Sequence, residues 1–288
     1  MERQLALETF DVPPFALNMP KELEVPGGGW TWPCSTATLI SGETEAVLID
    51  TVPTLRESNR LIDWIKASGK TLKTIYITHG HFDHYIGASI VLEHFPDASL
   101  VATKSTIDFI EEERETGRDR AIWSPLFTEE IAQNVIIPEL TSGSLDIEGH
   151  EITAVEVGQS DIPRSSYVHI PSLGAVIVGD IAYNQVHPTL IDSDQETRSA
   201  WIQTLSDLLD LKPKIVVASH RTPDSINDIR AIEETIAYLR TANQLLEENP
   251  STSKFIERMM AAYPSFQNLS TLYVGAASLG LEDFSEVG

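Results

Sequence analysis

Four side chains that bind metal ions stand within six residues of this sequence, in the segment 79–84, which reads His-Gly-His-Phe-Asp-His. The preceding residues, 72–78, are rich in β-branched side chains and predict a strand that ends where the cluster begins. A turn after a strand lets such closely spaced side chains point at one or two ions, whereas a regular helix would spread them around its axis. Imidazole and carboxylate ligands together suit zinc, and also iron or manganese. The sequence therefore predicts a metal centre at the end of this strand.

Other apolar strands also end in polar side chains that could join this centre. They are the segments 46–49, 175–178 and 214–219, which lead to Asp50, Asp180 and His220. Helices are predicted between the strands, over 54–68, over 85–95 and after a capping box at 193–196. Strands and helices therefore alternate in both halves of the chain, which favours sheets with helices packed on them.

The pattern changes after residue 220. Isoleucines and leucines recur at helical spacing from 226 to 239, and a second helical pattern begins at Phe255. We expect a catalytic domain over residues 1–221 and a C-terminal helical extension over 222–288 that packs on the same domain. These helices could cap the active-site cleft or form the surface of a homodimer.

The metal-binding segment, the Gly-Asp pair at 179–180 and the histidine at 220 together resemble the signature of the metallo-β-lactamase superfamily. The resemblance extends over roughly residues 36–220. It implies an α+β fold, a four-layer αββα sandwich, with the site at the edge between two β-sheets. It also implies a first metal ion bound by His79 and His81. A second ion would be bound by Asp83, His84 and His220, and the carboxylate of Asp180 would bridge the two.

One position departs from the superfamily pattern. Members commonly carry Gly-His-Thr or Gly-His-Ser after a strand, but residues 158–161 read Gly-Gln-Ser-Asp, so Gln159 replaces the third imidazole of the first metal position. A neutral amide oxygen is a poorer zinc ligand than imidazole. Three arrangements are open: Gln159 binds weakly through its oxygen, Asp161 takes its place, or only the second position is filled. We expect one or two zinc ions at unequal sites, with iron or manganese as alternatives.

The resemblance implies a metal-dependent hydrolase. A metal ion lowers the pKa of a bound water to about 7, so that metal-bound hydroxide can attack an acyl carbonyl at neutral pH. The substrate would be an ester, lactone, thioester or β-lactam in a small molecule, as in a lactonase-like enzyme. A true β-lactamase is less expected because no secretory signal is evident. Asp83 is expected to orient the nucleophile or pass its proton onward, in addition to binding metal.

Two segments are candidates for substrate contacts. Tyr183, Asn184 and His187 follow the bridging Asp180 closely, so they are predicted to line the cleft. The glycine-rich loop 27–32 carries two indoles, Trp30 and Trp32, which would form either a lid over an apolar substrate or a partly buried aromatic brace.

Composition limits the remaining functions. The 288 residues carry a net charge of −23, from 20 basic and 43 acidic residues, and such a field repels nucleic acid. No stretch reaches the roughly 20 apolar residues of a membrane span. The single cysteine, Cys34, excludes an internal disulfide and is expected to be a buried thiol. We therefore expect a cytoplasmic protein that binds a small-molecule substrate, with neither nucleic acid nor membrane as a partner.

Two alternatives stay open. A non-haem iron redox protein could use the same ligands, and would reveal itself by iron retention and oxygen-dependent activity. A catalytically weak binding member of the fold is the second alternative, suggested by Gln159, although the presence of the other six ligands argues against it.

Overall fold

Two five-stranded sheets lie face to face in the computed structural model, which describes residues 5–19, 25, 29–117, 124–132, 135–191 and 193–281. The first sheet comprises, in spatial order, β1 (Ala6–Val12), β4 (Ser35–Ser41), β5 (Glu45–Ile49), β6 (Thr71–Ile77) and β7 (Ser99–Ala102). The second comprises β12 (Ile215–Ala218), β11 (Ala175–Gly179), β10 (Pro163–Ile170), β9 (His150–Gln159) and β8 (Ser144–Ile147). A short pair, β2 (Phe15–Ala16) and β3 (Thr31–Trp32), lies apart from both sheets.

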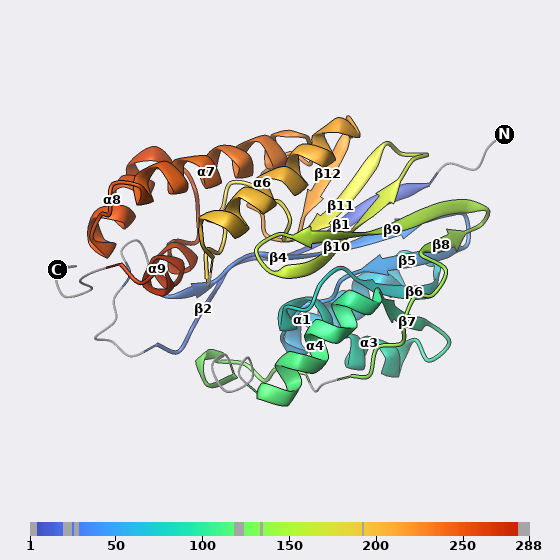
Figure 1. Ribbon diagram of the computed structural model, residues 1–288. Coiled ribbons are helices and arrows are strands. Elements are labelled where there is room, and N and C mark those ends of the chain that lie inside the picture. Colours follow the sequence, from blue (N-terminus) through green and yellow to red (C-terminus); the bar gives the residue numbers. More distant parts are fainter. Residues whose placement is uncertain are drawn as a thin grey trace.

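Helices cover the outer face of each sheet (Figure 1). On the first sheet lie α1 (Leu55–Ala67), α3 (Ala88–His94) and α4 (Lys104–Thr116). On the second lie α6 (Gln195–Asp210) and α7 (Arg230–Leu246), followed by α8 (Thr252–Ala262) and α9 (Leu269–Ser278). The four-layer αββα architecture expected from the resemblance is confirmed.

Three hydrophobic clusters fill the three spaces between these layers, and alternation along the strands feeds them. In β5, Leu48 packs against the helices of the first sheet, while Val47 and Ile49 face the second sheet. In β11, Val176 packs against α6 and α7, while Ile177 faces the first sheet. Because side chains of a strand alternate between its two faces, strands buried on both sides read as continuous apolar runs, as these do.

The predicted elements differ from the observed ones in four places. The helix predicted over 85–95 is interrupted at residues 86–87, between α2 (Phe82–Tyr85) and α3, and Gly87 lies so close to the Val52 carbonyl that a Cβ there would collide with it. Residues 136–147, whose sequence predicts one strand, form a strand only over β8, and the capping box of α6 begins at Asp194 instead of Ser193. The edge strand β1 was not predicted.

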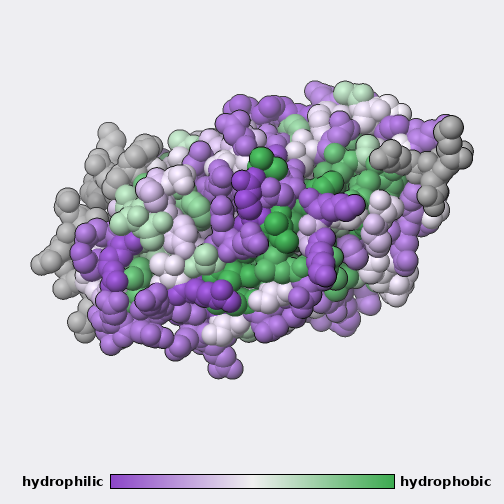
Figure 2. Space-filling view, turned by 90° about the horizontal axis from the view of Figure 1, so that it is seen from above, coloured by the Kyte–Doolittle hydropathy of each residue, from purple (hydrophilic) through white to green (hydrophobic). Residues whose placement is uncertain are grey.

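The C-terminal helices predicted after residue 220 are present and share one hydrophobic cluster with α6 and β11. Seen from their side of the molecule, the surface is mainly hydrophilic, with hydrophobic residues gathered in a narrower band (Figure 2). The division into a catalytic domain and an extension at residue 221 stays a prediction. No helix in the described part of the chain has both the length and the apolar character needed to cross a membrane.

Candidate metal centre

The predicted metal ligands converge at one edge of the sandwich, between the two sheets. The segment 79–84 follows β6 of the first sheet. In the second sheet, Asp180 comes directly after β11, and His220 comes two residues after the end of β12. The turn between β9 and β10 adds a further carboxylate, Asp161. The centre is therefore assembled from the ends of strands in both sheets.

Four of these side chains form a first group. The ligand atoms of His79, His81, Asp161 and Asp180 all lie within 4.8 Å of one another. His79 Nε2 is 3.2 Å from His81 Nδ1 and 3.5 Å from Asp180 Oδ2. His81 Nδ1 is 3.3 Å from Asp161 Oδ2. Distances of this size fit side chains that share one ion, whose ligand bonds are about 2 Å long.

A second group lies on the other side of Asp180. Asp83, His84 and His220 also place one ligand atom each within 4.8 Å of the others. Asp180 Oδ1 is 3.4 Å from His84 Nε2, and Asp180 Oδ2 is 3.1 Å from His220 Nε2. One carboxylate thus faces both groups, which is the arrangement expected of a residue that bridges two ions.

Atoms without hydrogen-bond partners show that these residues fit a metal ion. Asp83 Oδ2, His84 Nε2 and Asp180 Oδ1 are buried, and none makes a hydrogen bond within the described parts of the chain. Buried polar atoms are almost always paired, because leaving one unpaired costs about 1–3 kcal/mol. Divalent cations bound among these carboxylates and imidazoles would satisfy all three atoms and offset the clustered negative charge.

The outer nitrogens of the imidazoles are fixed by hydrogen bonds. His84 Nδ1 lies 3.0 Å from Asp50 Oδ2, and His220 Nδ1 lies 2.7 Å from the carbonyl oxygen of Cys34. The Thr78 hydroxyl donates to Asp50 at 2.7 Å and can accept from His79 Nδ1 at 3.0 Å. Such partners orient metal-binding histidines and leave Nε2 unprotonated toward the ion.

Asp50 is the residue of this site that the sequence placed at a strand end without giving it a specific role. Both its oxygens accept hydrogen bonds, from the Thr78 amide and hydroxyl and from His84, so it acts as a positioning residue beside the ligands. The available signal was its place directly after the buried strand β5.

Burial and neighbouring charges shift the pKa values of the histidines and carboxyls of the site in opposite directions. Burial lowers the pKa of His79, whereas for His81 burial is outweighed by Asp161 and Asp180, which raise its pKa to about 9. Burial also opposes ionisation of Asp180, but His220, His84 and His79 hold the pKa of this carboxyl well below its ordinary value. Burial, with Asp161 and Asp180, raises the pKa of Tyr183, which therefore stays a neutral hydrogen-bond donor.

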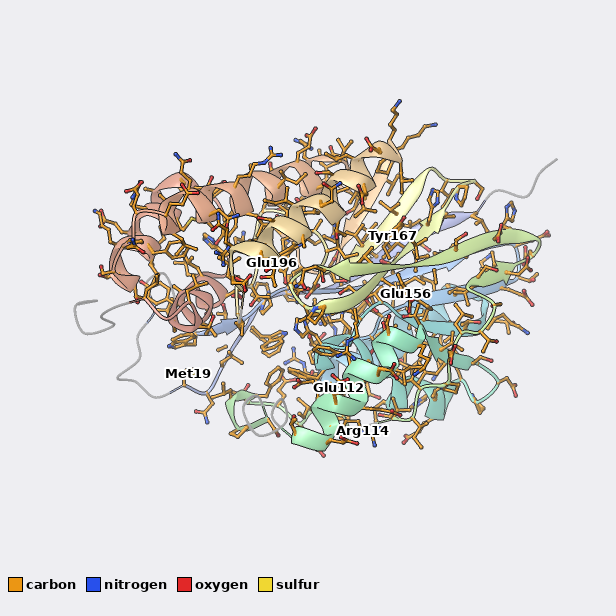
Figure 3. All side chains as sticks on the ribbon, viewed as in Figure 1. Met19, Glu112, Arg114, Glu156, Tyr167 and Glu196 are labelled. Atoms are coloured by element: carbon orange, nitrogen blue, oxygen red, sulfur yellow. The ribbon has the colours of Figure 1, made fainter. Side chains whose placement is uncertain are left out.

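A cavity of about 690 Å³ opens over the ligands. Its walls include Trp30, Trp32, Tyr183 and Gln159, while Gly27 and Gly28 of the predicted loop lie outside the described residues. Met19 also lines the cavity, and both it and Glu112 of α4 lie in the lower half of the view in Figure 3.

Arg164 donates two hydrogen bonds to Glu112, at 2.8 and 2.6 Å, and so ties the start of β10 to α4.

Two residues predicted to contact substrate lie away from the cavity. The Asn184 amide donates to the carbonyl of Ile226 at 3.0 Å, and His187 is buried against Tyr238, with its Nδ1 3.1 Å from the phenol oxygen. The chain after Asp180 turns beneath the C-terminal helices, so closeness in sequence did not place these side chains at the cleft. Their contacts indicate structural roles in place of the predicted substrate contacts.

Cys34 is buried, as expected, and burial raises the pKa of its thiol to about 12. A thiol that stays protonated at neutral pH is a poor nucleophile.

Comparison with known proteins decides the family. The family model of the metallo-beta-lactamase superfamily matches residues 30–220. The chain belongs to this superfamily. Solved structures agree: a metallo-beta-lactamase family protein from Thermus thermophilus has a TM-score of 0.61 at 16% identity, covering 95% of this chain and 91% of that one. A metallo-beta-lactamase from Pontibacter korlensis has a TM-score of 0.58 at 18% identity, covering 83% and 96%.

Curated relatives match over shorter segments of this superfamily member. Hydroxyacylglutathione hydrolase 1 of Vibrio vulnificus is 36% identical over 62 residues, which is 22% of this chain and 24% of the relative. Ribonuclease J of Pyrococcus abyssi is 27% identical over 136 residues, 46% of this chain and 28% of the relative. The chain therefore aligns with only about a quarter of the length of these two relatives.

Proposed function

We propose that this chain is a metal-dependent hydrolase that cleaves an acyl bond, foremost that of an ester or lactone, in a small uncharged molecule. The observation that carries the proposal is the position of the ligand cluster: His81, Asp83, Asp180 and His220 are part of the wall of a cavity that is otherwise mostly apolar. Membership of the superfamily and the match to a hydroxyacylglutathione hydrolase support metal-dependent hydrolysis.

The residues divide the work between binding metal and binding substrate. His79, His81 and Asp180 would hold one ion, and Asp83, His84, His220 and Asp180 the other. Bound zinc supplies Lewis acidity and lowers the pKa of water to about 7. Asp83 borders the cavity, so in addition to binding metal it can orient a water molecule and accept a proton from it. The indoles of Trp30 and Trp32 offer apolar surface to the acyl chain.

The charge of the cavity favours an uncharged substrate. No lysine or arginine lines it within the described ranges, and the one acidic side chain outside the ligand cluster is Glu113. A β-lactam or a glutathione thioester carries carboxylates, for which binding sites usually provide Arg or Lys. RNA, on which the relative from Pyrococcus abyssi acts by its name, would also meet the chain's net charge of −23. Apolar walls instead suit an ester or lactone with a hydrocarbon chain.

A substrate panel tests this proposal. The zinc-loaded protein should hydrolyse long-chain lactones and esters with a kcat/KM at least about tenfold above that for a carboxylate-bearing β-lactam or an S-acylglutathione. Each CH₂ buried in the cavity contributes about 0.8 kcal/mol, so activity should rise along a series of chain lengths. Equal or greater activity on the anionic substrates would refute the substrate class. Loss of turnover in Asp83→Ala and His84→Ala, with folding retained, is required, and full activity in either would refute the mechanism.

A matched pair of variants checks that the cavity binds the acyl chain. Val274 of α9 lines the cavity, whereas Ala277 on the same helix is exposed. Val274→Phe should raise KM for long-chain substrates more than for short ones, because the added ring fills space the chain would occupy. Ala277→Phe adds a ring outside the cavity and should leave both KM values unchanged. Similar effects of the two variants would place substrate elsewhere.

The identity of the metal is part of the proposal. Zinc fits the mixture of imidazole and carboxylate ligands, and manganese and iron fit the same set. The group of His79, His81, Asp161 and Asp180 offers two imidazoles and two carboxylates, where the superfamily pattern has three imidazoles. The additional carboxylate is a reason to test the redox alternative. Metal analysis of the purified protein should find zinc, and hydrolysis should proceed without oxygen. Retained iron together with oxygen consumption would instead support a redox protein.

A further inference from the structure

Gln159 stands where the superfamily pattern has an imidazole, and its side-chain amide nitrogen is engaged elsewhere. That nitrogen donates to the carbonyl oxygen of Ser160 at 2.9 Å, and the backbone carbonyl of Gln159 accepts from the Thr204 hydroxyl at 2.8 Å. These contacts hold the residue along the end of β9. The first group of ligand atoms is thus left with two imidazoles and needs another donor for a complete site.

Asp161, two residues further along, presents one oxygen to this gap. Its Oδ1 accepts hydrogen bonds from the Ile162 amide and the Ser160 hydroxyl, both at 2.9 Å, which fix the plane of the carboxylate. Its Oδ2 then lies 3.3 Å from His81 Nδ1 and belongs to the group of ligand atoms within 4.8 Å of one another. The carboxylate is only 7% exposed.

The turn that holds Asp161 is itself well fixed. The Ser160 amide donates to the carbonyl of Ile162 at 2.9 Å, and the Ser160 hydroxyl lies 2.7 Å from that of Ser165 on β10. From the opposite side, the Tyr183 phenol donates to Asp161 Oδ2 at 3.1 Å. The carboxylate is therefore oriented in advance, as a ligand supported by hydrogen bonds would be.

The carboxylates of Asp161 and Asp180 lie close together, with His81 Nδ1 3.3 Å from the first and 3.7 Å from the second. Capping the turn uses only Oδ1, and the other oxygen is directed to a buried region that already contains the carboxylate of Asp180. Like charges at such distances destabilise one another unless a cation lies between them.

We infer that Asp161 Oδ2 is a metal ligand of this chain and takes the place of the third imidazole at the first metal position. The first ion is then held by His79, His81, Asp161 and Asp180, and Tyr183 is a positioning residue for the two carboxylates. This inference concerns the site of the proposed function, and it rests on that function only in requiring a metal. An added oxygen donor in place of a nitrogen should also reduce the preference of this position for zinc over manganese.

Metal titration of the metal-free full-length chain tests the ligand assignment without any substrate. Zinc and manganese would be titrated separately against a competing chelating dye, and metal content measured after dialysis. Asp161→Asn keeps the shape and an oxygen for the turn, so the fold should persist by circular dichroism. It should weaken the weaker zinc position at least about tenfold and leave the tighter one unchanged. Gln159→Ala, the matched control, should leave both affinities within about twofold.

A rescue variant guards against a merely structural effect. Adding Gln159→His to Asp161→Asn returns an imidazole to the pattern, so it should restore the affinity of the weaker position for zinc. The ratio of zinc to manganese affinity there should also exceed that of the unmodified chain. The assignment is overturned if Asp161→Asn binds both ions normally, if Gln159→Ala loses the weaker ion, or if the double variant fails to recover zinc. Absence of hydrolysis on every substrate would instead overturn the proposed function alone.

Discussion

Replacing Asp50 by asparagine should weaken both the fold and the metal centre. Asp50 Oδ1 accepts from the Thr78 amide at 2.8 Å, and Oδ2 accepts from the Thr78 hydroxyl at 2.7 Å and lies 3.0 Å from His84 Nδ1. Asparagine has one oxygen and one NH₂ group, so either orientation of the amide leaves at least one buried donor facing another donor. An unsatisfied buried donor costs about 1–3 kcal/mol, and we expect that decrease in the free energy of unfolding.

The same substitution should also lower metal affinity. Loss of an outer hydrogen-bond partner typically reduces metal affinity by about 10- to 100-fold, which corresponds to roughly 1.4–2.8 kcal/mol. The largest effect is expected at the position of His84, whose ring Asp50 orients directly. Urea denaturation of the metal-free protein measures the first effect, and zinc titration against a chelating dye measures the second.

A matched control uses Asp63, an exposed residue of α1 that lies outside the site. Asp63→Asn should change neither stability nor zinc affinity. If Asp50→Asn leaves the free energy of unfolding within about 0.5 kcal/mol of the unmodified chain and binds zinc equally well, the role of Asp50 as a positioning residue is refuted.

Three further predictions follow from the structure. Gly179 has a φ of 53°, and a Cβ there would lie 2.7 Å from the Thr78 hydroxyl and 3.3 Å from His79 Nδ1. Gly179→Ala should therefore lower the free energy of unfolding, measured with urea, by about 1–3 kcal/mol and weaken zinc binding. Normal zinc binding would show that His79 is not displaced. The amide of Glu43, with the side chain of Thr44, lowers the pKa of Glu148 to about 2. The stability that this ionised carboxylate contributes is present above about pH 4.5 and is lost as the pH falls toward 2. In Glu148→Gln the free energy of unfolding should therefore fall less steeply with pH in this range, and an unchanged slope would contradict the prediction. Zinc at a hundredfold excess over its dissociation constant should raise the free energy of unfolding by about 2.7 kcal/mol, an effect that a chelator reverses; an equal melting temperature with and without zinc would show that no ion binds the folded chain preferentially.

Local sequence was sufficient for the elements whose signals are continuous. The apolar runs of β5, β11 and β12 and the last three residues of β6 are buried on both faces, so each reads as a strand without knowledge of its neighbours. The polar residues that end these strands could therefore be picked out as candidate ligands, and the resemblance gave them their expected roles. Periodicity did not select the four-layer arrangement, which came from the resemblance, because alternating strands and helices fit several architectures.

The features that sequence missed depend on contacts distant along the chain. Strand β1 carries polar residues and is buried only toward its end, and its identity as a strand comes from pairing with β4. Asp161 was one of three arrangements that the sequence left open, because only the register of β9 against β10 places its turn beside His81. Asn184 was misplaced for the same reason: it pairs with Arg221, beyond the end of β12.

Helix α9 contributes Ser270, Thr271 and Val274 to the cavity, although the superfamily match ends at residue 220. Leu17 and Met19, on another part of the wall, precede the start of that match at residue 30. Mutations in these two stretches can thus alter which molecule is accepted while every ligand of the metal centre stays in place. Substrate preference in chains of this architecture can evolve separately from the catalytic apparatus, and similarity confined to the shared segment is a poor guide to what such a chain hydrolyses.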